Sequence, residues 1–185
     1  MRYMLLRLVF ITSKKMDFSK GINYQLATLF GIGKLPGGGT WSSLMILLIA
    51  LAENSAETAS FIAFFSLIIA PRAYKKLVNE LQNEDPKEFV LDEVIGMGIA
   101  LGLVNAFIYF FSNNANFDTQ FFNKNNLFII TFIIFRFFDI SKVGPVGWIE
   151  NNKNETPYIR VIGDDIAAAL LSALIIIIFF NLWAL

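Results

Sequence analysis

Apolar residues in this sequence form long runs that are separated by short polar segments. The runs are Leu44–Ala52, Phe61–Ala70, Gly96–Phe111, Leu127–Phe135 and Ile166–Trp183. A helix that crosses the ~30 Å hydrocarbon core of a bilayer needs ~20 predominantly apolar residues. Val94–Phe111 and Ile166–Trp183 come close to that length. The pattern therefore predicts an all-α fold, a polytopic membrane helical bundle.

Three shorter apolar segments complete the predicted bundle. Leu127–Ile140 has Arg136 near its end, where a long side chain can reach the lipid headgroups. Trp41–Ala52 and Ala59–Ala70 are separated by a short polar segment, so they predict a helical hairpin, with a re-entrant pair as the alternative. The expectation is about five membrane helices, the first two of them short. Residues 1–25 are expected to form an N-terminal interfacial segment and residues 26–185 a single membrane-embedded domain.

The basic residues orient this bundle in the membrane. With these spans, every Lys and Arg except Lys124 falls on one side. The positive-inside rule makes that side cytoplasmic. The formal net charge of +0 provides no basic field for nucleic acid. The chain has no Cys and no His, so its chemistry must use carboxylates, Lys, Arg, hydroxyls or hard metal ions held by oxygen.

Carboxylates from three separate helices lie at the predicted cytoplasmic helix ends. They are Asp92, Glu93, Asp139, Asp164 and Asp165. An acidic side chain costs ~2.5–3.5 kcal/mol at the bilayer centre and less near the interface. Several carboxylates at one depth also repel one another unless a cation is bound. The set favours a metal site, although a solvated pair at Asp92 and Glu93 and a helix cap at Asp164 or Asp165 are the simpler alternatives.

Asp85 has a different interpretation. Pro86 follows it directly and Glu88 comes three residues later, which is the pattern of a capping box with proline at the first helical position. The pattern predicts a helix that begins here with Asp85 as its cap.

A glycine-rich segment, Leu26–Leu44, precedes the first apolar run. Its glycines surround Lys34 and Pro36, and the next helix is expected to start near Thr40. Glycine lets backbone N–H groups approach an anion, and a helix N-terminus favours phosphate. The alternative is a flexible turn with Thr40 as the helix cap.

Charged residues also recur every third position near the end of the fourth apolar run. Arg136, Asp139 and Lys142 are spaced so that they share a helix face. They form either a local ion pair or a functional group in which Asp139 binds metal and the cations bind phosphate oxygens.

Four segments together carry a resemblance to a known family. Their strings are LATLFGIGKLPGGGTWSSL, DPKEFVLDEVIG, FRFFDISK and GDDIAAAL, and they extend from about Leu26 to Leu174. In this order they resemble the phosphatidylglycerophosphatase A family of bacterial membrane enzymes. The resemblance implies Mg²⁺-dependent removal of the terminal phosphate from phosphatidylglycerol phosphate. It also implies a multi-pass enzyme of the bacterial inner membrane whose active site faces the cytoplasm.

The resemblance implies the following site residues. The candidate catalytic residues are Asp92, Glu93, Asp139, Asp164 and Asp165. Within that group the Mg²⁺ ligands are expected to be Glu93, Asp139, Asp164 and Asp165, and Asp92 is the expected general base. The candidate substrate-binding residues are Thr28, Gly31, Gly33, Lys34, Pro36, Gly39, Thr40, Arg136 and Lys142.

Two other functions stay open at this point. One is a phosphatase of another lipid or of a prenyl phosphate. The other is a divalent-cation transporter, which predicts acids near the bilayer midplane in both halves of the chain rather than at one interface. The expected partners are a phospholipid substrate in the cytoplasmic leaflet and the membrane itself. The oligomeric state stays open.

Overall fold

The computed structural model describes residues 20–112 and 123–183, and within these ranges the chain is helical with no strand. The elements are α2 (Ile22–Ala27), the 3-10 turn η2 (Ile32–Lys34), α3 (Gly38–Glu53), α4 (Glu57–Leu81), α5 (Leu91–Ser112), α6 (Lys124–Ser141), α7 (Pro145–Glu150) and α8 (Pro157–Trp183). The predicted all-α fold is confirmed. All five predicted apolar segments lie in helices, namely α3, α4, α5, α6 and α8.

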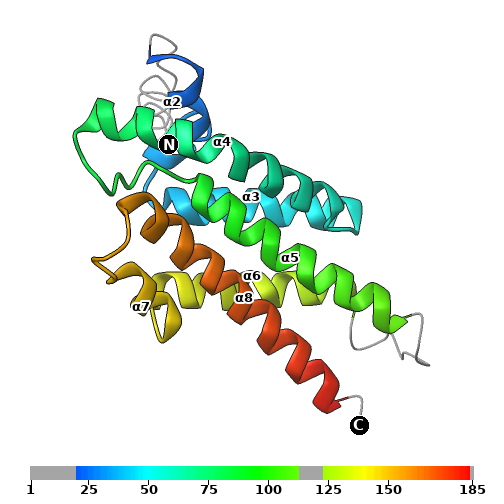
Figure 1. Ribbon diagram of the computed structural model, residues 1–185. Helices are drawn as coiled ribbons and strands as arrows, with labels where there is room; N and C mark the ends of the chain where they lie inside the picture. The colour runs from blue at the N-terminus through cyan, green and yellow to red at the C-terminus, as the bar shows by residue number, and fades with distance from the viewer. Residues whose placement is uncertain (1–19, 113–122, 184–185) are drawn as a thin grey trace, which may run out of the picture.

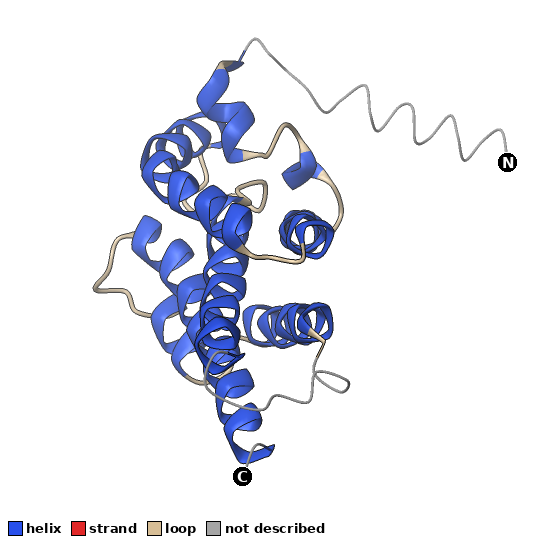
Figure 2. Cartoon of the chain, turned by 90° about the vertical axis from the view of Figure 1, so that its right-hand side faces the viewer, coloured by secondary structure: helices blue, strands red, loops and turns tan. Residues whose placement is uncertain are grey.

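Helix α5 is the centre of the bundle. It packs most extensively against α8 and α4, and it also contacts α3 and α6. The short helices lie outside this group, with α2 against α4 and α7 against α8. Figure 1 shows that α3, α5 and α8 begin, and α6 ends, at the same end of the bundle. Figure 2 shows the helices joined by loops, seen from the side.

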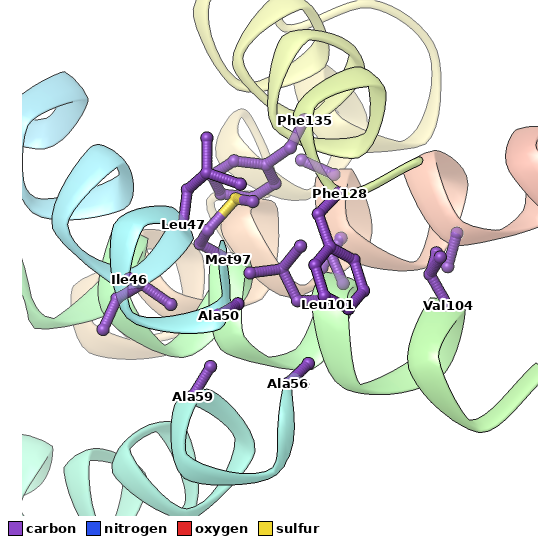
Figure 3. Packing of buried hydrophobic residues seen from close by; sticks show 14 of the residues in the cluster. Ile46, Leu47, Ala50, Ala56, Ala59, Met97, Leu101, Val104, Phe128 and Phe135 are labelled. Carbon is purple, nitrogen blue, oxygen red and sulfur yellow. The ribbon is translucent and has the colours of Figure 1, made fainter. Parts of the chain in front are cut away.

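A hydrophobic cluster fills the space between α3, α5 and α6 (Figure 3). Leu101, Phe128 and Phe135 are fully buried in it. Leu47 and Met97 are buried beside them. These side chains fix the distances between α3, α5 and α6, and two of these helices carry site acids, Asp92 and Glu93 in α5 and Asp139 in α6.

Small residues allow α5 to approach its neighbours closely. A Cβ atom at Gly98 would lie 2.5 Å from the Cβ atom of Ala63 in α4. A Cβ atom at Gly96 would lie 2.8 Å from the Phe135 ring and 3.0 Å from the backbone oxygen of Asp165. Real Cβ atoms do not come so close, so glycine at position 96 brings α5, α6 and α8 together beside the acidic residues.

Helix α4 is longer than the sequence predicts. The apolar run ends at Ala70, but α4 continues through Pro71 to Leu81. Proline removes one helical hydrogen bond. The turns beyond it are held because Ala73, Tyr74 and Leu77 are buried in a second hydrophobic cluster.

The predicted capping box at Asp85 is wrong. Helix α5 begins at Leu91, and residues 83–90 form a loop in which Asn83 Oδ1 accepts a hydrogen bond from the Asp85 backbone N–H at 3.1 Å. The Val90 N–H donates to the backbone oxygen of Ala27 at 3.1 Å, a contact between distant parts of the chain. Asp92 and Glu93 consequently lie in the first turn of α5.

The helix caps considered as alternatives at Thr40 and at Asp164 or Asp165 are not formed either. Gly37, in a left-handed conformation, precedes α3, and Thr40 lies inside the helix. Helix α8 begins at Pro157, where Thr156 Oγ1 accepts a hydrogen bond from the Ile159 N–H at 3.4 Å. Asp164 and Asp165 therefore lie about two turns inside α8, where neither of them acts as a cap.

Two of the described helices are both long and apolar enough to cross a membrane. They span Leu91–Phe110 in α5 and Pro157–Phe180 in α8, and α3 is a shorter apolar helix. The full set of about five membrane helices stays a prediction. Of the predicted interfacial segment, residues 1–19 lie outside the described residues, and residues 22–25 belong to α2.

Candidate metal and phosphate site

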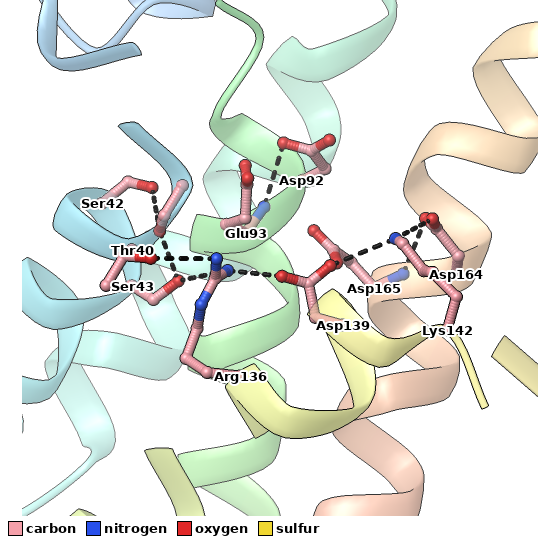
Figure 4. Close-up of polar contacts among 11 residues, drawn as sticks. Thr40, Ser42, Ser43, Asp92, Glu93, Arg136, Asp139, Lys142, Asp164 and Asp165 are labelled. Carbon is pink, nitrogen blue, oxygen red and sulfur yellow. Dashed lines mark hydrogen bonds and ion pairs between the residues drawn. The ribbon is translucent and has the colours of Figure 1, made fainter. Parts of the chain in front are cut away.

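Three carboxylates from two helices converge at one end of the bundle. Asp92 and Glu93 extend from the first turn of α5, and Asp165 extends from α8 (Figure 4). Each offers one oxygen, and these three oxygens lie within 4.8 Å of one another. Asp92 is 8% exposed and Asp165 is 2% exposed. The grouping places like charges together where little water can screen them.

Two oxygens of this cluster have no hydrogen-bond partner among the described residues. They are Oε2 of Glu93 and Oδ1 of Asp165, and both are buried. An unsatisfied buried polar group costs about 1–3 kcal/mol, and more when it is charged. Carboxylate oxygens are the ligands that Mg²⁺ and other hard cations prefer. The donor set therefore fits a hard divalent cation.

A row of ion pairs and hydrogen bonds lies beside the cluster and joins α3, α6 and α8. Arg136 Nη1 lies 2.5 Å from Asp139 Oδ2, and Arg136 Nη2 donates to Thr40 Oγ1 at 3.1 Å. Lys142 Nζ lies 3.2 Å from Asp139 Oδ1 and 2.5 Å from Asp164 Oδ2. Figure 4 shows the row crossing from Thr40 to Asp164.

Two of the predicted metal ligands, Asp139 and Asp164, belong to this row and differ from Glu93 and Asp165 in their partners. Both oxygens of Asp139 are paired with cations. One oxygen of Asp164 is paired with Lys142, and the other accepts the backbone N–H of Asp165 at 2.9 Å. In Glu93 and Asp165, by contrast, an oxygen is left over. The structure thus brings all five predicted acids to one site but gives them different partners.

Lys142 is held at the end of α6 in a left-handed conformation with φ of 51°. Burial alone would lower the pKa of its ammonium group, but Asp164 and then Asp139 raise that pKa above its ordinary value. The side chain is therefore charged throughout the neutral pH range. It balances one charge of the two aspartates that it joins.

The three-carboxylate cluster opens into a cavity of about 300 Å³. Its lining residues are Glu84, Asp85, Pro86, Lys87, Phe89, Asp92, Glu93, Asp139, Lys142, Glu150, Pro157, Arg160, Val161, Asp164 and Asp165. All five predicted catalytic acids are among them. The cavity is large enough for a phosphate group and part of a polar headgroup.

The glycine-rich segment lies beside the cavity and not in its lining. Thr28 Oγ1 is buried and donates to the backbone oxygen of Tyr24 at 3.1 Å. Lys34 Nζ lies over the Tyr24 ring, 4.9 Å from its centroid, and Pro36 is exposed. Gly31 has a left-handed conformation, and Gly33 lies directly against the backbone of Glu88. Contact of these residues with substrate stays a prediction.

Two residues of that segment do reach the polar site. Thr40 accepts the hydrogen bond from Arg136 described above. Gly39 lies against Glu93, and a Cβ atom at position 39 would overlap the Glu93 carboxylate. Gly39 thus leaves the space in which the Glu93 side chain sits.

Replacing Gly39 with alanine is expected to move the Glu93 carboxylate and to lower kcat/KM by about 10- to 100-fold, as loss of a residue that orients a metal ligand does. The measurement is phosphate release from phosphatidylglycerol phosphate, the substrate that the sequence resemblance implies, as a function of Mg²⁺ concentration. The double variant Gly39→Ala/Glu93→Asp should be no less active than Glu93→Asp alone, because the shorter side chain leaves room for the added methyl group. A Gly39→Ala variant with unchanged Mg²⁺ activation would show that this contact does not position Glu93.

Four charged residues of the cavity lining are absent from the sequence predictions, namely Glu84, Lys87, Glu150 and Arg160. Arg160 lies on α8, four residues before Asp164, and lines the cavity with it. Residues four apart share a helix face. That spacing is the signal that could have identified Arg160 once α8 was known to begin at Pro157.

Comparison with protein families gives one match, to the family described as Phosphatidylglycerophosphatase A, over residues 25–180. The matched range includes every described residue of the cavity lining. Comparison with curated proteins gives no match, and comparison with solved structures gives none either.

Proposed function

Because the chain belongs to the phosphatidylglycerophosphatase A family, whose members are phosphoric monoester hydrolases, we propose that it performs Mg²⁺-dependent hydrolysis of phosphatidylglycerol phosphate at the α5–α6–α8 cavity. The products are phosphatidylglycerol and inorganic phosphate, and the reaction serves phospholipid biosynthesis. The observation that carries the proposal is the cluster of Asp92, Glu93 and Asp165 with its two unpartnered oxygens.

The arrangement of acids supports a division of roles. Glu93 and Asp165 each have a buried oxygen without a partner, so we assign them as the principal Mg²⁺ ligands. Mg²⁺ held there would polarise the phosphoryl group and lower the pKa of a bound water molecule. Asp139 and Asp164, also expected as ligands from the sequence, have both oxygens in other interactions. Their proposed role is to fix Lys142 beside the cluster.

Asp92 is the proposed general base. Its Oδ1 accepts the backbone N–H of Glu93 at 3.0 Å, which holds the carboxylate in place at the cavity wall. Its carboxylate lines the cavity, where it can take a proton from a water molecule. Lys142 lines the same cavity as a fixed positive charge, so it is placed to offset negative charge on the phosphoryl group.

The outer surface of the bundle supports insertion in a membrane. Large apolar side chains are exposed on the outer faces of α4, α6 and α8, including Phe61, Phe64, Ile133, Phe137, Leu174 and Ile178. In water such a surface would be an aggregation hazard, whereas lipid tails cover it without cost. We place the chain in the bacterial inner membrane as a multi-pass protein. The cavity faces the cytoplasmic leaflet, from which the lipid substrate enters.

The test is phosphate release by the purified protein in mixed micelles. Phosphatidylglycerol phosphate, phosphatidic acid and a prenyl phosphate are compared, each with and without Mg²⁺. We expect release from phosphatidylglycerol phosphate that disappears when EDTA removes the metal. Release from phosphatidic acid or the prenyl phosphate alone would assign another substrate. No release from any of them by folded protein with Mg²⁺ present would overturn the proposal.

A further inference from the structure

The cavity wall is strongly acidic, which poses a problem for an anionic substrate. Eight carboxylate residues line it, against the three cations Lys87, Lys142 and Arg160. A phosphate monoester carries a charge near −2 at neutral pH. A metal ion at the three-carboxylate cluster is balanced by that cluster, so attraction of the phosphate needs a further cation whose charge is not already balanced.

Two of the three cations are poorly suited to this task. Lys142 is paired with Asp139 and Asp164, so its charge does not suffice to attract the phosphate group, although it stays in place to offset charge that develops on the phosphoryl group. Lys87 is exposed on the loop before α5, where water screens its charge and leaves the side chain mobile.

Arg160 differs from both of them. It is half-buried, and its Nε atom is buried without a hydrogen-bond acceptor among the described residues. No ion pair joins Arg160 to a carboxylate in the part of the chain that the structure describes. Its positive charge acts on Tyr74 of α4, whose hydroxyl donates to the backbone oxygen of Glu84. Arg160 therefore lines the cavity with a positive charge that no ion pair among the described residues balances.

From its position on α8, Arg160 can reach a phosphate group that is bound at the three-carboxylate cluster. Four and five residues separate it from Asp164 and Asp165, which corresponds to a rise of about 6 to 8 Å along the helix. A phosphate group that touches the cluster can be reached by an arginine side chain over that distance. Guanidinium groups bind phosphate oxygens through two parallel N–H donors, an arrangement that an ammonium group does not provide.

We propose that Arg160 is the phosphate-binding residue of this cavity and that it contacts the phosphoryl oxygens of the substrate and of the released inorganic phosphate. This inference rests on the proposed function for the identity of the substrate. It assigns the anion-binding role to a residue of α8, in addition to the candidates in the glycine-rich segment and on α6.

The experiment compares Arg160→Gln and Arg160→Lys with the wild type. Arg72→Gln is the matched control, because Arg72 is exposed on α4 and lies outside the cavity lining. For each protein, kcat and KM for phosphatidylglycerol phosphate and the inhibition constant for inorganic phosphate are measured. Charge-assisted hydrogen bonds contribute enough that Arg160→Gln should raise KM and the phosphate inhibition constant roughly 10- to 100-fold. For Arg160→Lys, both constants should lie between those of the wild type and those of Arg160→Gln. For Arg72→Gln, both constants should match the wild type. In the Arg160 variants, kcat should change less than KM.

The outcomes separate this inference from the proposed function. Unchanged KM and unchanged phosphate inhibition in an active Arg160→Gln variant would overturn the role of Arg160 and leave the phosphatase assignment intact. If the wild type releases no phosphate from any lipid, binding of inorganic phosphate is measured directly by calorimetry with Mg²⁺ present. Equal affinity of the wild type and Arg160→Gln then overturns the inference, and weaker affinity of the variant supports it. If Arg160→Gln does not fold, Arg160→Lys is judged by the same constants.

Discussion

Replacing Glu93 with glutamine is expected to have opposite effects on activity and on stability. The variant should lose about 100-fold or more of its Mg²⁺-dependent kcat/KM, because loss of the proposed metal ligand weakens Mg²⁺ binding and the electrostatic stabilisation that depends on it. In metal-free buffer the same variant should unfold at a higher temperature than the wild type. Three carboxylates whose oxygens lie within 4.8 Å repel one another, and the neutral amide removes part of that repulsion.

The stability effect provides a readout that is independent of substrate. A gain of about 1 kcal/mol corresponds to a rise of roughly 2–4 °C in the unfolding midpoint for a chain of this size. Added Mg²⁺ should raise the midpoint of the wild type and have a much smaller effect on Glu93→Gln, because a ligand stabilises only the state that binds it. Glu155→Gln is the control, since Glu155 is exposed and lies outside the cavity lining. If Mg²⁺ stabilised both variants equally, the cluster would not be its binding site.

The arrangement of helices could be predicted largely from the sequence. Long apolar runs fix where the helices lie, as Gly96–Phe111 in α5 and Ile166–Trp183 in α8 show. When consecutive helices run in opposite directions, the end of one helix and the start of the next lie at the same end of the bundle. Asp139 at the end of α6 and Asp165 near the start of α8 therefore had to lie at the same end of the bundle.

The starts of the helices could not be predicted in the same way. The sequence around Asp85 satisfies the local rule for a helix start. The structure instead gives the N–H of Val90 to the backbone of Ala27, which lies far away in the chain. A local pattern contains no information about such a partner, so tertiary contacts decided where α5 begins.

The division of the acids into two groups also depends on contacts between helices. Lys142 lies three residues after Asp139, and that pair was visible in the sequence. Its contact with Asp164 of α8 depends on how closely α6 and α8 pack. The position of Lys34 could not be predicted from the sequence for the same reason. Its ammonium group lies over the Tyr24 ring of α2, outside the cavity lining.

Lys142→Met is expected to destabilise the protein by about 3 kcal/mol, the lower end of the range for removing one partner of a buried ion pair. The lower end applies because the Lys142 side chain is 28% exposed. The substitution leaves Asp164 with only the backbone N–H of Asp165 and leaves Asp139 with Arg136 alone. Thermal unfolding in detergent, with the wild type in parallel, measures the effect.

The pH dependence of this difference follows from the raised pKa of Lys142. A lysine whose folded-state pKa lies above its unfolded value of about 10.4 stabilises the protein fully below that value, and the contribution is lost as pH rises through the folded-state pKa. The difference between the wild type and Lys142→Met should therefore stay constant between about pH 7 and pH 9.

Two further variants separate the ion pair from a general loss of positive charge. Lys76→Met removes a lysine from an exposed pair with Glu80, at 2.7 Å, and should cost no more than about 0.5 kcal/mol. The double variant Lys142→Met/Asp164→Asn removes both buried charges and should recover much of the lost stability, because replacing both partners avoids an unpaired carboxylate. If the double variant were as unstable as Lys142→Met, the cost would come from lost packing of the lysine side chain. Recovery of stability would instead show that the cost of Lys142→Met comes from the unpaired carboxylate of Asp164.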